Sequence, residues 1–362
     1  MIAFSKRAAQ AIAFVCMFAF FAFAEAQQSQ LVDRELTSTN FSHNKIGISP
    51  VRKIVVYLPA GYGQSTERYP VIYFLPNPLD GDYHSHFKEG DAQELFDRAI
   101  AGGVIGKFIL VAADMNTPLG TSWYVNSSVT GNWEDFMVQE LVPYIDFNFK
   151  TLPNRDSRAI AGIFMGGYGA IRFGMKHPDV FGTVYAMHPV GTGSGVQIME
   201  TRPNWELMAK AKSLDDIKSD GFSTIFTSIF QAHLPNPDNP PLFIDFPAHR
   251  EGDRLIIDAK VTERLRTNFF LESMIPQYAE NLKSLHGLKF DWSRSDTNQD
   301  HVYSNQAFTH KLNEFGIVHE AEEYNGAWGE PNWGRDGRIY MDVLPFFAQH
   351  LVFDEKHEPE RK

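Results

Sequence analysis

The stretch that most constrains the fold runs from Arg158 to His177 and reads RAIAGIFMGGYGAIRFGMKH. Its first part is a short apolar run of the kind found in buried strands, and its second part has apolar residues at helical spacing. Between them lies a glycine-rich segment containing Gly162 and Gly166. Because glycine allows close backbone approach, the pattern predicts a buried strand over 158–165, a tight turn, and a helix over 166–177.

The same alternation of strand and helix recurs along the chain. Helical patterns separate the apolar runs, which predicts a doubly wound α/β architecture with a mostly parallel sheet. The predicted strands are 52–59, 70–76, 108–114, 158–165, 183–189, 288–293 and 319–325, and the predicted helices are 91–103, 132–146, 166–177, 304–316 and 337–351. Residues 195–285 break the alternation and are interpreted as a cap inserted into one domain over 27–353, with a disordered tail over 354–362.

The N-terminal 26 residues are typical of an export signal. Lys6 and Arg7 precede the apolar run AIAFVCMFAFFAFA, and small residues follow that allow cleavage after Ala24 or Ala26. The single cysteine, Cys16, lies inside this run, so we expect a mature chain without disulfides or cysteine-bound zinc. This pattern predicts a periplasmic or secreted protein that does not associate with a membrane after cleavage.

Charge and composition exclude some partners. The net charge of −11 is unfavourable for binding nucleic acid or an anionic membrane surface. With 43% hydrophobic residues, the 362-residue chain can bury a large core. We therefore expect a globular protein, with its oligomeric state left open.

The glycine-rich turn has the form on which many hydrolases mount a nucleophile, Gly-x-Ser-x-Gly. Here Phe164 stands between Gly162 and Gly166 where the serine is expected. A phenyl ring has no hydroxyl to activate, and a bulky residue in this turn carries a strain of about 1–3 kcal/mol. The backbone N–H of the next residue, Met165, would still face the oxyanion side of the site.

Four stretches together resemble the esterase D group of α/β-hydrolases. They are VYLPAGYGQSTERYPVIYFLP, VQELVPYIDFNF, RAIAGIFMGGYGAIRFGMKHPDVFG and NQAFTHKLNEFGIVHEAEEY, within residues 35–350. This group includes S-formylglutathione hydrolases, feruloyl and enterochelin esterases, and antigen 85 mycolyltransferases. The resemblance implies the α/β-hydrolase fold and carboxylic-ester hydrolysis or acyl transfer, with no cofactor.

The resemblance also assigns the catalytic positions. The family histidine falls in YNGAWGEPNW, where Trp328 is its equivalent, or Asn332 under a shifted alignment, and residues 320–349 contain no histidine. The acid position in DWSRSD is Asp296, with Asp300 as the alternative. Without a histidine to orient, we favour the interpretation that Asp296 and Asp300 are solvated loop residues.

Pocket positions follow from the same resemblance. Asn77, in PNPLDG, stands on the oxyanion side where relatives carry His-Gly, and Trp123 and Tyr124 stand where relatives line the pocket. The chain is therefore predicted to be a pseudoesterase or a repurposed protein that binds an ester, a glycoside or an aromatic acid. The alternative is an active ester hydrolase or acyltransferase with a displaced catalytic constellation.

A separate motif allows a third function. The segment LDGDYHSHF places Asp80, Asp82, His84 and His86 at alternating positions, and His188 follows another predicted strand. Carboxylates and imidazoles bind zinc or a similar divalent ion, so a metal-dependent enzyme is possible. The structural alternative is an ordinary surface turn.

The signal-peptide interpretation predicts that the exported protein begins at Glu25 or Gln27. N-terminal sequencing of protein recovered from the periplasm or medium tests this expectation. Recovery of a membrane-bound form that still carries Met1 would contradict it.

Overall fold

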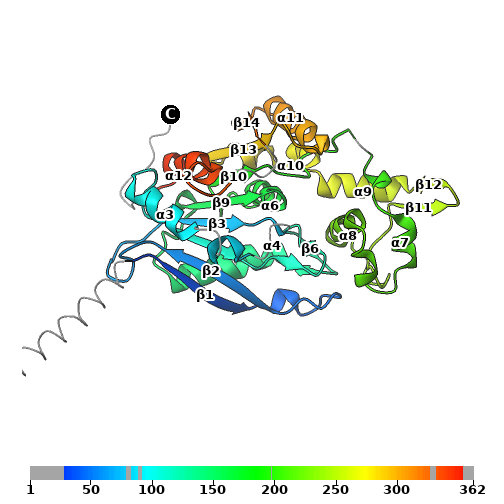
Figure 1. Cartoon of the computed structure of the whole chain (residues 1–362), viewed down its shortest axis with the longest axis horizontal. Helices are drawn as coiled ribbons and strands as arrows, with labels where there is room; N and C mark the ends of the chain where they lie inside the picture. The colour runs from blue at the N-terminus through cyan, green and yellow to red at the C-terminus, as the bar shows by residue number, and fades with distance from the viewer. Residues whose placement is uncertain (1–27, 79–82, 89–91, 197, 327–331, 354–362) are drawn as a thin grey trace, which may run out of the picture.

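The centre of the fold is an eight-stranded sheet. The computed structural model describes residues 28–78, 83–88, 92–196, 198–326 and 332–353 (Figure 1). The strand order is β1-β2-β4-β3-β9-β10-β13-β14, in which β4 to β14 run parallel and β2 is antiparallel to both neighbours. The predicted doubly wound, mostly parallel sheet is thus confirmed. The strands are β1 (Gln30–Thr37), β2 (Val51–Leu58), β3 (Val71–Leu75), β4 (Ile109–Ala113), β9 (Arg158–Ile163), β10 (Thr183–Met187), β13 (Gly287–Ser293) and β14 (Glu320–Tyr324).

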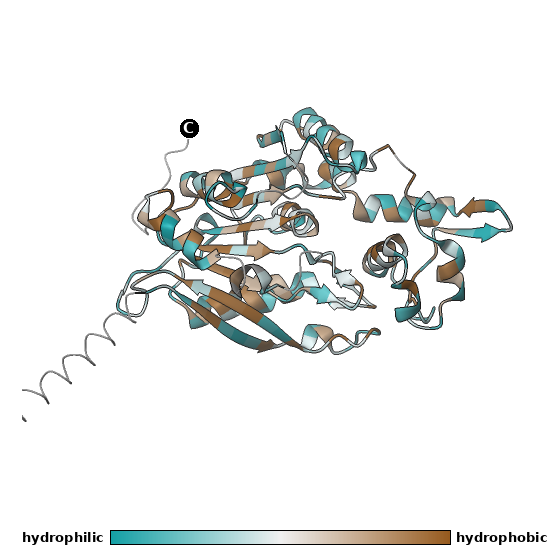
Figure 2. Cartoon of the chain, viewed as in Figure 1, coloured by the Kyte–Doolittle hydropathy of each residue, from teal (hydrophilic) through white to brown (hydrophobic). Residues whose placement is uncertain are grey.

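All seven predicted strands are present, and β1 is an eighth that the sequence pattern did not reveal. Every residue of β3, β4, β9 and β10 is buried, which explains their continuous apolar character (Figure 2). In contrast, β1 lies at the edge of the sheet, and most of its residues are exposed or half-buried. An edge strand needs few apolar residues, so its sequence, QLVDRELT, carries only a weak signal.

Helices cover both faces of the sheet, as neighbouring residues of β10 show. The face that carries Val184 packs against α6 (Met165–Lys176), where Gly174 leaves room for the valine. The ring of Tyr185 points the other way and contacts Phe346 and Phe347 of α12 (Leu344–His350). Among the described residues, no helix is long and apolar enough to cross a bilayer.

Beyond the carboxyl ends of the strands, a smaller group of elements extends the molecule (Figure 1). It comprises α7 (Trp205–Lys210), α8 (Gly221–His233), β11 (Ala248–Glu251), β12 (Arg254–Ile257) and α9 (Ala259–Phe269). This group lies within the predicted cap range, and it touches the main domain where the Trp123 indole N–H donates to Ser228 Oγ of α8 at 2.9 Å. The next helix, α10 (Leu271–Lys283), packs against α6 instead.

The backbone passes very closely in the turn between β9 and α6. A Cβ added at Gly162 would lie 2.1 Å from the carbonyl oxygen of Gly166. A Cβ added at Gly166 would lie 1.9 Å from the carbonyl oxygen of Leu75, at the end of β3. Both contacts are with backbone atoms, which cannot move aside as a flexible side chain would.

We therefore expect Gly162→Ala and Gly166→Ala each to lower the free energy of unfolding by ~3 kcal/mol or more, the upper end of typical overpacking costs. Urea unfolding measures this effect. The matched control is Gly63→Ala in a loop where an added Cβ meets nothing within 4 Å. Equal stability of Gly162→Ala, Gly166→Ala and Gly63→Ala would contradict the close passage.

Candidate functional site

Phe164 occupies the tip of the β9–α6 turn. Its backbone has φ 58° and ψ −108°, a conformation that non-glycine residues rarely adopt. The conformation is held from both sides, because the Phe164 N–H donates to Met187 O at 2.9 Å and its carbonyl accepts from Tyr168 N–H at 3.0 Å. The residue is thus placed as a nucleophile would be, at a strained turn that leads directly into a helix.

A cavity of about 690 Å³ lies between this turn and the outlying helices. Phe164 lines it together with Met165 and Trp123, two of the predicted pocket residues. Residues of α8, with Phe269 at the end of α9 and Phe270 after it, supply much of the opposite wall. Its lining is mainly apolar with a few polar groups, and it includes Leu119, Val190, Met199, Phe222, Ile225, Phe226, Ile229, Phe269, Phe270, Arg202, Asn298, Asp300 and His301.

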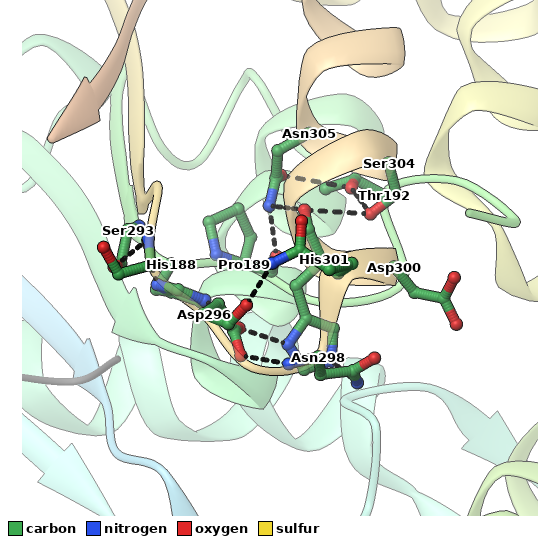
Figure 3. Close-up of polar contacts among 12 residues, drawn as sticks. His188, Pro189, Thr192, Ser293, Asp296, Asn298, Asp300, His301, Ser304 and Asn305 are labelled. Carbon is green, nitrogen blue, oxygen red and sulfur yellow. Dashed lines mark hydrogen bonds and ion pairs between the residues drawn. The ribbon is translucent and has the colours of Figure 1, made fainter. Parts of the chain in front are cut away.

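A buried carboxylate lies beside Phe164, between two histidines. Asp296 Oδ2 is 2.8 Å from His188 Nε2 and 2.7 Å from His301 Nδ1, and the Asn298 N–H donates to Asp296 Oδ1 at 2.7 Å (Figure 3). His188 follows β10, Asp296 follows β13, and His301 is in the first turn of α11 (Gln299–Glu314). Asp296 is only 3% exposed, so it is not the solvated loop residue considered above.

Both imidazole rings contact the phenyl ring of Phe164. The His301 ring meets it edge-on, with centroids 5.2 Å apart and planes at 88°. The His188 ring lies at 5.6 Å with planes at 33°. The alternative acid, Asp300, points away from this cluster in Figure 3 and pairs with Arg202.

The hydrogen bonds fix the protons on both histidines. His188 Nδ1 accepts from the Ser293 N–H at 3.1 Å, so the proton of a neutral ring is on Nε2, facing Asp296. His301 Nε2 is 2.7 Å from Asn298 Nδ2, and the Arg202 guanidinium at Asn298 Oδ1 fixes that amide with its NH₂ toward the histidine. His301 therefore carries its proton on Nδ1, also facing Asp296.

This network keeps Asp296 ionised and His188 neutral. Burial opposes the charge on Asp296, but hydrogen bonds from His188, His301 and the Asn298 N–H outweigh it and hold the Asp296 pKa well below its usual value. For His188, burial dominates and lowers the pKa, although the neighbouring Asp296 partly opposes that shift. The result is a carboxylate stabilised by neutral N–H donors.

The same three side chains have a composition that can bind metal. Their ligand atoms lie within 4.8 Å of one another. A metal between the rings would need lone pairs on His188 Nε2 and His301 Nδ1, which moves the protons to the outer nitrogens. Those nitrogens face N–H donors from Ser293 and Asn298, so the hydrogen bonding disfavours metal at this position.

The position of His188 depends on a second buried carboxylate. His188 has φ 46°, and its N–H lies 2.7 Å from Asp291 O and 3.2 Å from Asp291 Oδ1. The Asp291 side chain also accepts from Tyr185 at 2.8 Å and pairs with Arg338 at 2.9 Å. Although burial raises the pKa of Asp291, these partners hold the end of β13 against the end of β10.

The remaining predicted site residues are separated from this cluster or fall outside the described structure. Tyr124 packs against Gly169 of α6, with its hydroxyl 3.4 Å from Pro76 O, and Asn77 is buried just after β3.

His84 Nε2 bonds to Asp33 at 2.7 Å, and His86 lies in α2 (Ser85–Lys88). Trp328, Asp80 and Asp82 lie outside the described residues, so the metal prediction for the 80–86 segment stays a prediction.

Sequence reasoning sought the histidine after β14 and missed His301. The available signal is local: His301 follows Asp296 by five residues and lies three residues before the predicted helix 304–316. His188 was considered as a metal ligand, whereas the structure places it as a donor to Asp296. The expectation that Asp296 lacks a histidine partner is therefore wrong.

Because the His188 pKa is lowered on folding, the unfolded chain binds a proton there more readily. The free energy of unfolding should then fall as the pH drops below ~6.5, by up to ~1.4 kcal/mol per pH unit for this histidine until its folded pKa is reached. Urea unfolding between pH 7.5 and 5 measures the slope, which His188→Gln should reduce. The control is His249→Gln on the exposed β11, for which we expect the wild-type curve. An unchanged slope in His188→Gln would contradict this assignment.

Comparisons with known proteins agree with the fold. Residues 48–221 match the family model described as putative esterase. The chain is 33% identical over 149 residues to an esterase of Mycobacterium tuberculosis, covering 40% of this chain and 30% of that protein. It is 35% identical over 131 residues to an endo-1,4-beta-xylanase/feruloyl esterase of Xylanibacter ruminicola, covering 35% and 18%. The matched segments thus span less than a third of these curated relatives.

Solved structures extend the likeness to nearly the whole chain. A ferulic acid esterase aligns with a TM-score of 0.62 at 20% identity, covering 90% of this chain and 99% of its own. An S-formylglutathione hydrolase from Agrobacterium tumefaciens aligns with a TM-score of 0.56 at 13% identity, covering 90% and 97%. Residues 48–221, slightly less than half of the chain, are thus similar to the esterase family model, and the chain has the α/β-hydrolase fold.

Proposed function

We propose that this chain is an exported pseudoesterase, which binds a small ester or its acid in the cavity without forming an acyl-serine. The observation that carries the proposal is Phe164, which lies at the tip of the strained turn with its side chain in the cavity lining. A phenyl group cannot attack a carbonyl or transfer a proton. The N-terminal pattern of basic, apolar and small residues supports export.

The strained backbone at Phe164 supports a binding role for this turn, even though it carries no serine. A non-glycine residue at such a conformation costs about 1–3 kcal/mol, and relaxation of the turn would remove that cost. The turn has instead kept its geometry, and Phe164 packs against two imidazole rings. This arrangement is what we expect if the ring forms part of a binding surface.

The cavity supports a ligand with a substantial apolar part. Its volume of about 690 Å³ is within the range of small-molecule sites. Aromatic side chains such as Trp123 and Phe226 offer packing surfaces, and Arg202 and Asn298 provide polar groups. Two of the relatives above are named for feruloyl or ferulic acid esters, so we propose an aromatic acyl ester or acid as the ligand class.

We expect the purified wild type to bind methyl ferulate or ferulic acid without turning over esters. Calorimetric titration measures binding, and fluorophosphonate labelling with p-nitrophenyl acetate hydrolysis measures serine chemistry. Ile225→Trp should weaken binding at least tenfold, because Ile225 lines the cavity and the larger indole would fill part of it.

The matched control is Ile257→Trp, at a position 42% exposed on β12 and outside the cavity lining, which should leave binding unchanged. Stoichiometric fluorophosphonate labelling of a wild-type serine would show an active esterase with a displaced nucleophile. Loss of activity on chelation, with metal bound through His84 and His86, would instead favour the metal-dependent alternative.

A further inference from the structure

The two histidines beside Phe164 differ in how their second ring nitrogen is used. In His188, Nε2–H faces Asp296 and Nδ1 accepts from a backbone N–H, so both nitrogens are held within the protein interior. In His301, Nδ1–H faces Asp296, while Nε2 accepts from the Asn298 side-chain amide. Both His301 and Asn298 line the cavity.

The arrangement around His301 is the one a general base requires. A carboxylate on Nδ1–H fixes the tautomer and leaves the Nε2 lone pair available to take a proton. The ring lies edge-on to Phe164, with centroids 5.2 Å apart, so it adjoins the side chain at the nucleophile position. Only the side-chain amide of Asn298 needs to turn away for Nε2 to accept from another donor.

We propose that Asp296 and His301 form a general-base pair directed at position 164, with the base supplied by the first turn of α11. The family position after β14 contains no histidine, since none occurs in residues 320–349. The chain thus has the acid, Asp296, and a base at a new position, His301. The nucleophile is absent, because Phe164 stands at its position. His188 is a positioning residue that holds Asp296.

The pair implies a defined chemistry for a hydroxyl at position 164. The serine oxygen would add to the carbonyl carbon of a bound ester as its proton passes to His301 Nε2. That proton would then pass to the leaving alkoxide as the ester C–O bond breaks. A water would then add to the acyl carbon as His301 Nε2 takes its proton. That proton would pass to the serine oxygen as its bond to the acyl carbon breaks, which releases the acid and restores the serine.

The first test is Phe164→Ser, compared with Phe164→Ala, which opens the same space without a hydroxyl. We expect p-nitrophenyl acetate turnover at least ~10²-fold above Phe164→Ala, with fluorophosphonate labelling at the new serine. Adding His301→Gln should lower kcat by about 10²–10⁴-fold and remove the rise of kcat/KM with pH. Adding His188→Gln should cost less and leave that pH limb in place, because its amide can still donate to Asp296.

A thiol probe keeps the proposal falsifiable if the serine variant is folded but inert. The double variant Cys16→Ser, Phe164→Cys has its only cysteine at position 164. A neighbouring imidazole stabilises the thiolate, so the midpoint pH of the iodoacetamide alkylation rate should lie below the free-thiol value of about 8.5. His301→Gln should remove this shift. Alkylation profiles that are identical with and without His301, or serine activity unaffected by His301→Gln, would overturn the proposal. Neither result bears on whether the wild type binds a ligand.

Discussion

The structure depends most on the backbone contact where the β9–α6 turn passes the end of β3. Gly166 lies against the Leu75 carbonyl and Gly162 against Gly166, with no space for a Cβ at either position. This contact fixes the direction in which β9 ends and α6 begins, and so forces residue 164 into a positive φ with its side chain in the cavity lining. The geometry therefore belongs to the turn, and it persists whether the side chain at 164 is reactive or inert.

A second constraint is the burial of the Asp296 charge. A carboxylate removed from water needs several donors, and here two imidazoles and one backbone N–H supply them. Among the described residues, no lysine or arginine pairs with Asp296, so hydrogen bonds from the two imidazoles and the Asn298 N–H take the place of a permanently charged partner. This explains why both imidazoles turn a donor N–H toward Asp296. It also explains why the three side chains, whose types could bind a metal, are arranged as a carboxylate with two N–H donors.

The sequence was informative where one short segment determines the structure. The alternation of buried strands and helices predicted the sheet, and Gly162 and Gly166 predicted the turn that places Phe164. The edge strand β1 was missed because exposure on both faces leaves little apolar pattern. His188 and Asp296 come from different strands, separated in sequence by the cap, so no local pattern could show that they meet. The family resemblance gives no signal for His301, because it places the histidine after β14.

The five-residue spacing between Asp296 and His301 has a consequence for how the site can change over time. Both residues belong to one loop-and-helix segment, so their separation is encoded locally and does not depend on how distant loops are folded. In the family arrangement implied by the resemblance, the histidine instead comes from the loop after β14. Here the sequence of that loop contains no histidine, so its length and composition can vary without disturbing the Asp296–His301 pair. The recognition surface and the proton-transfer pair can thus diverge independently within one scaffold.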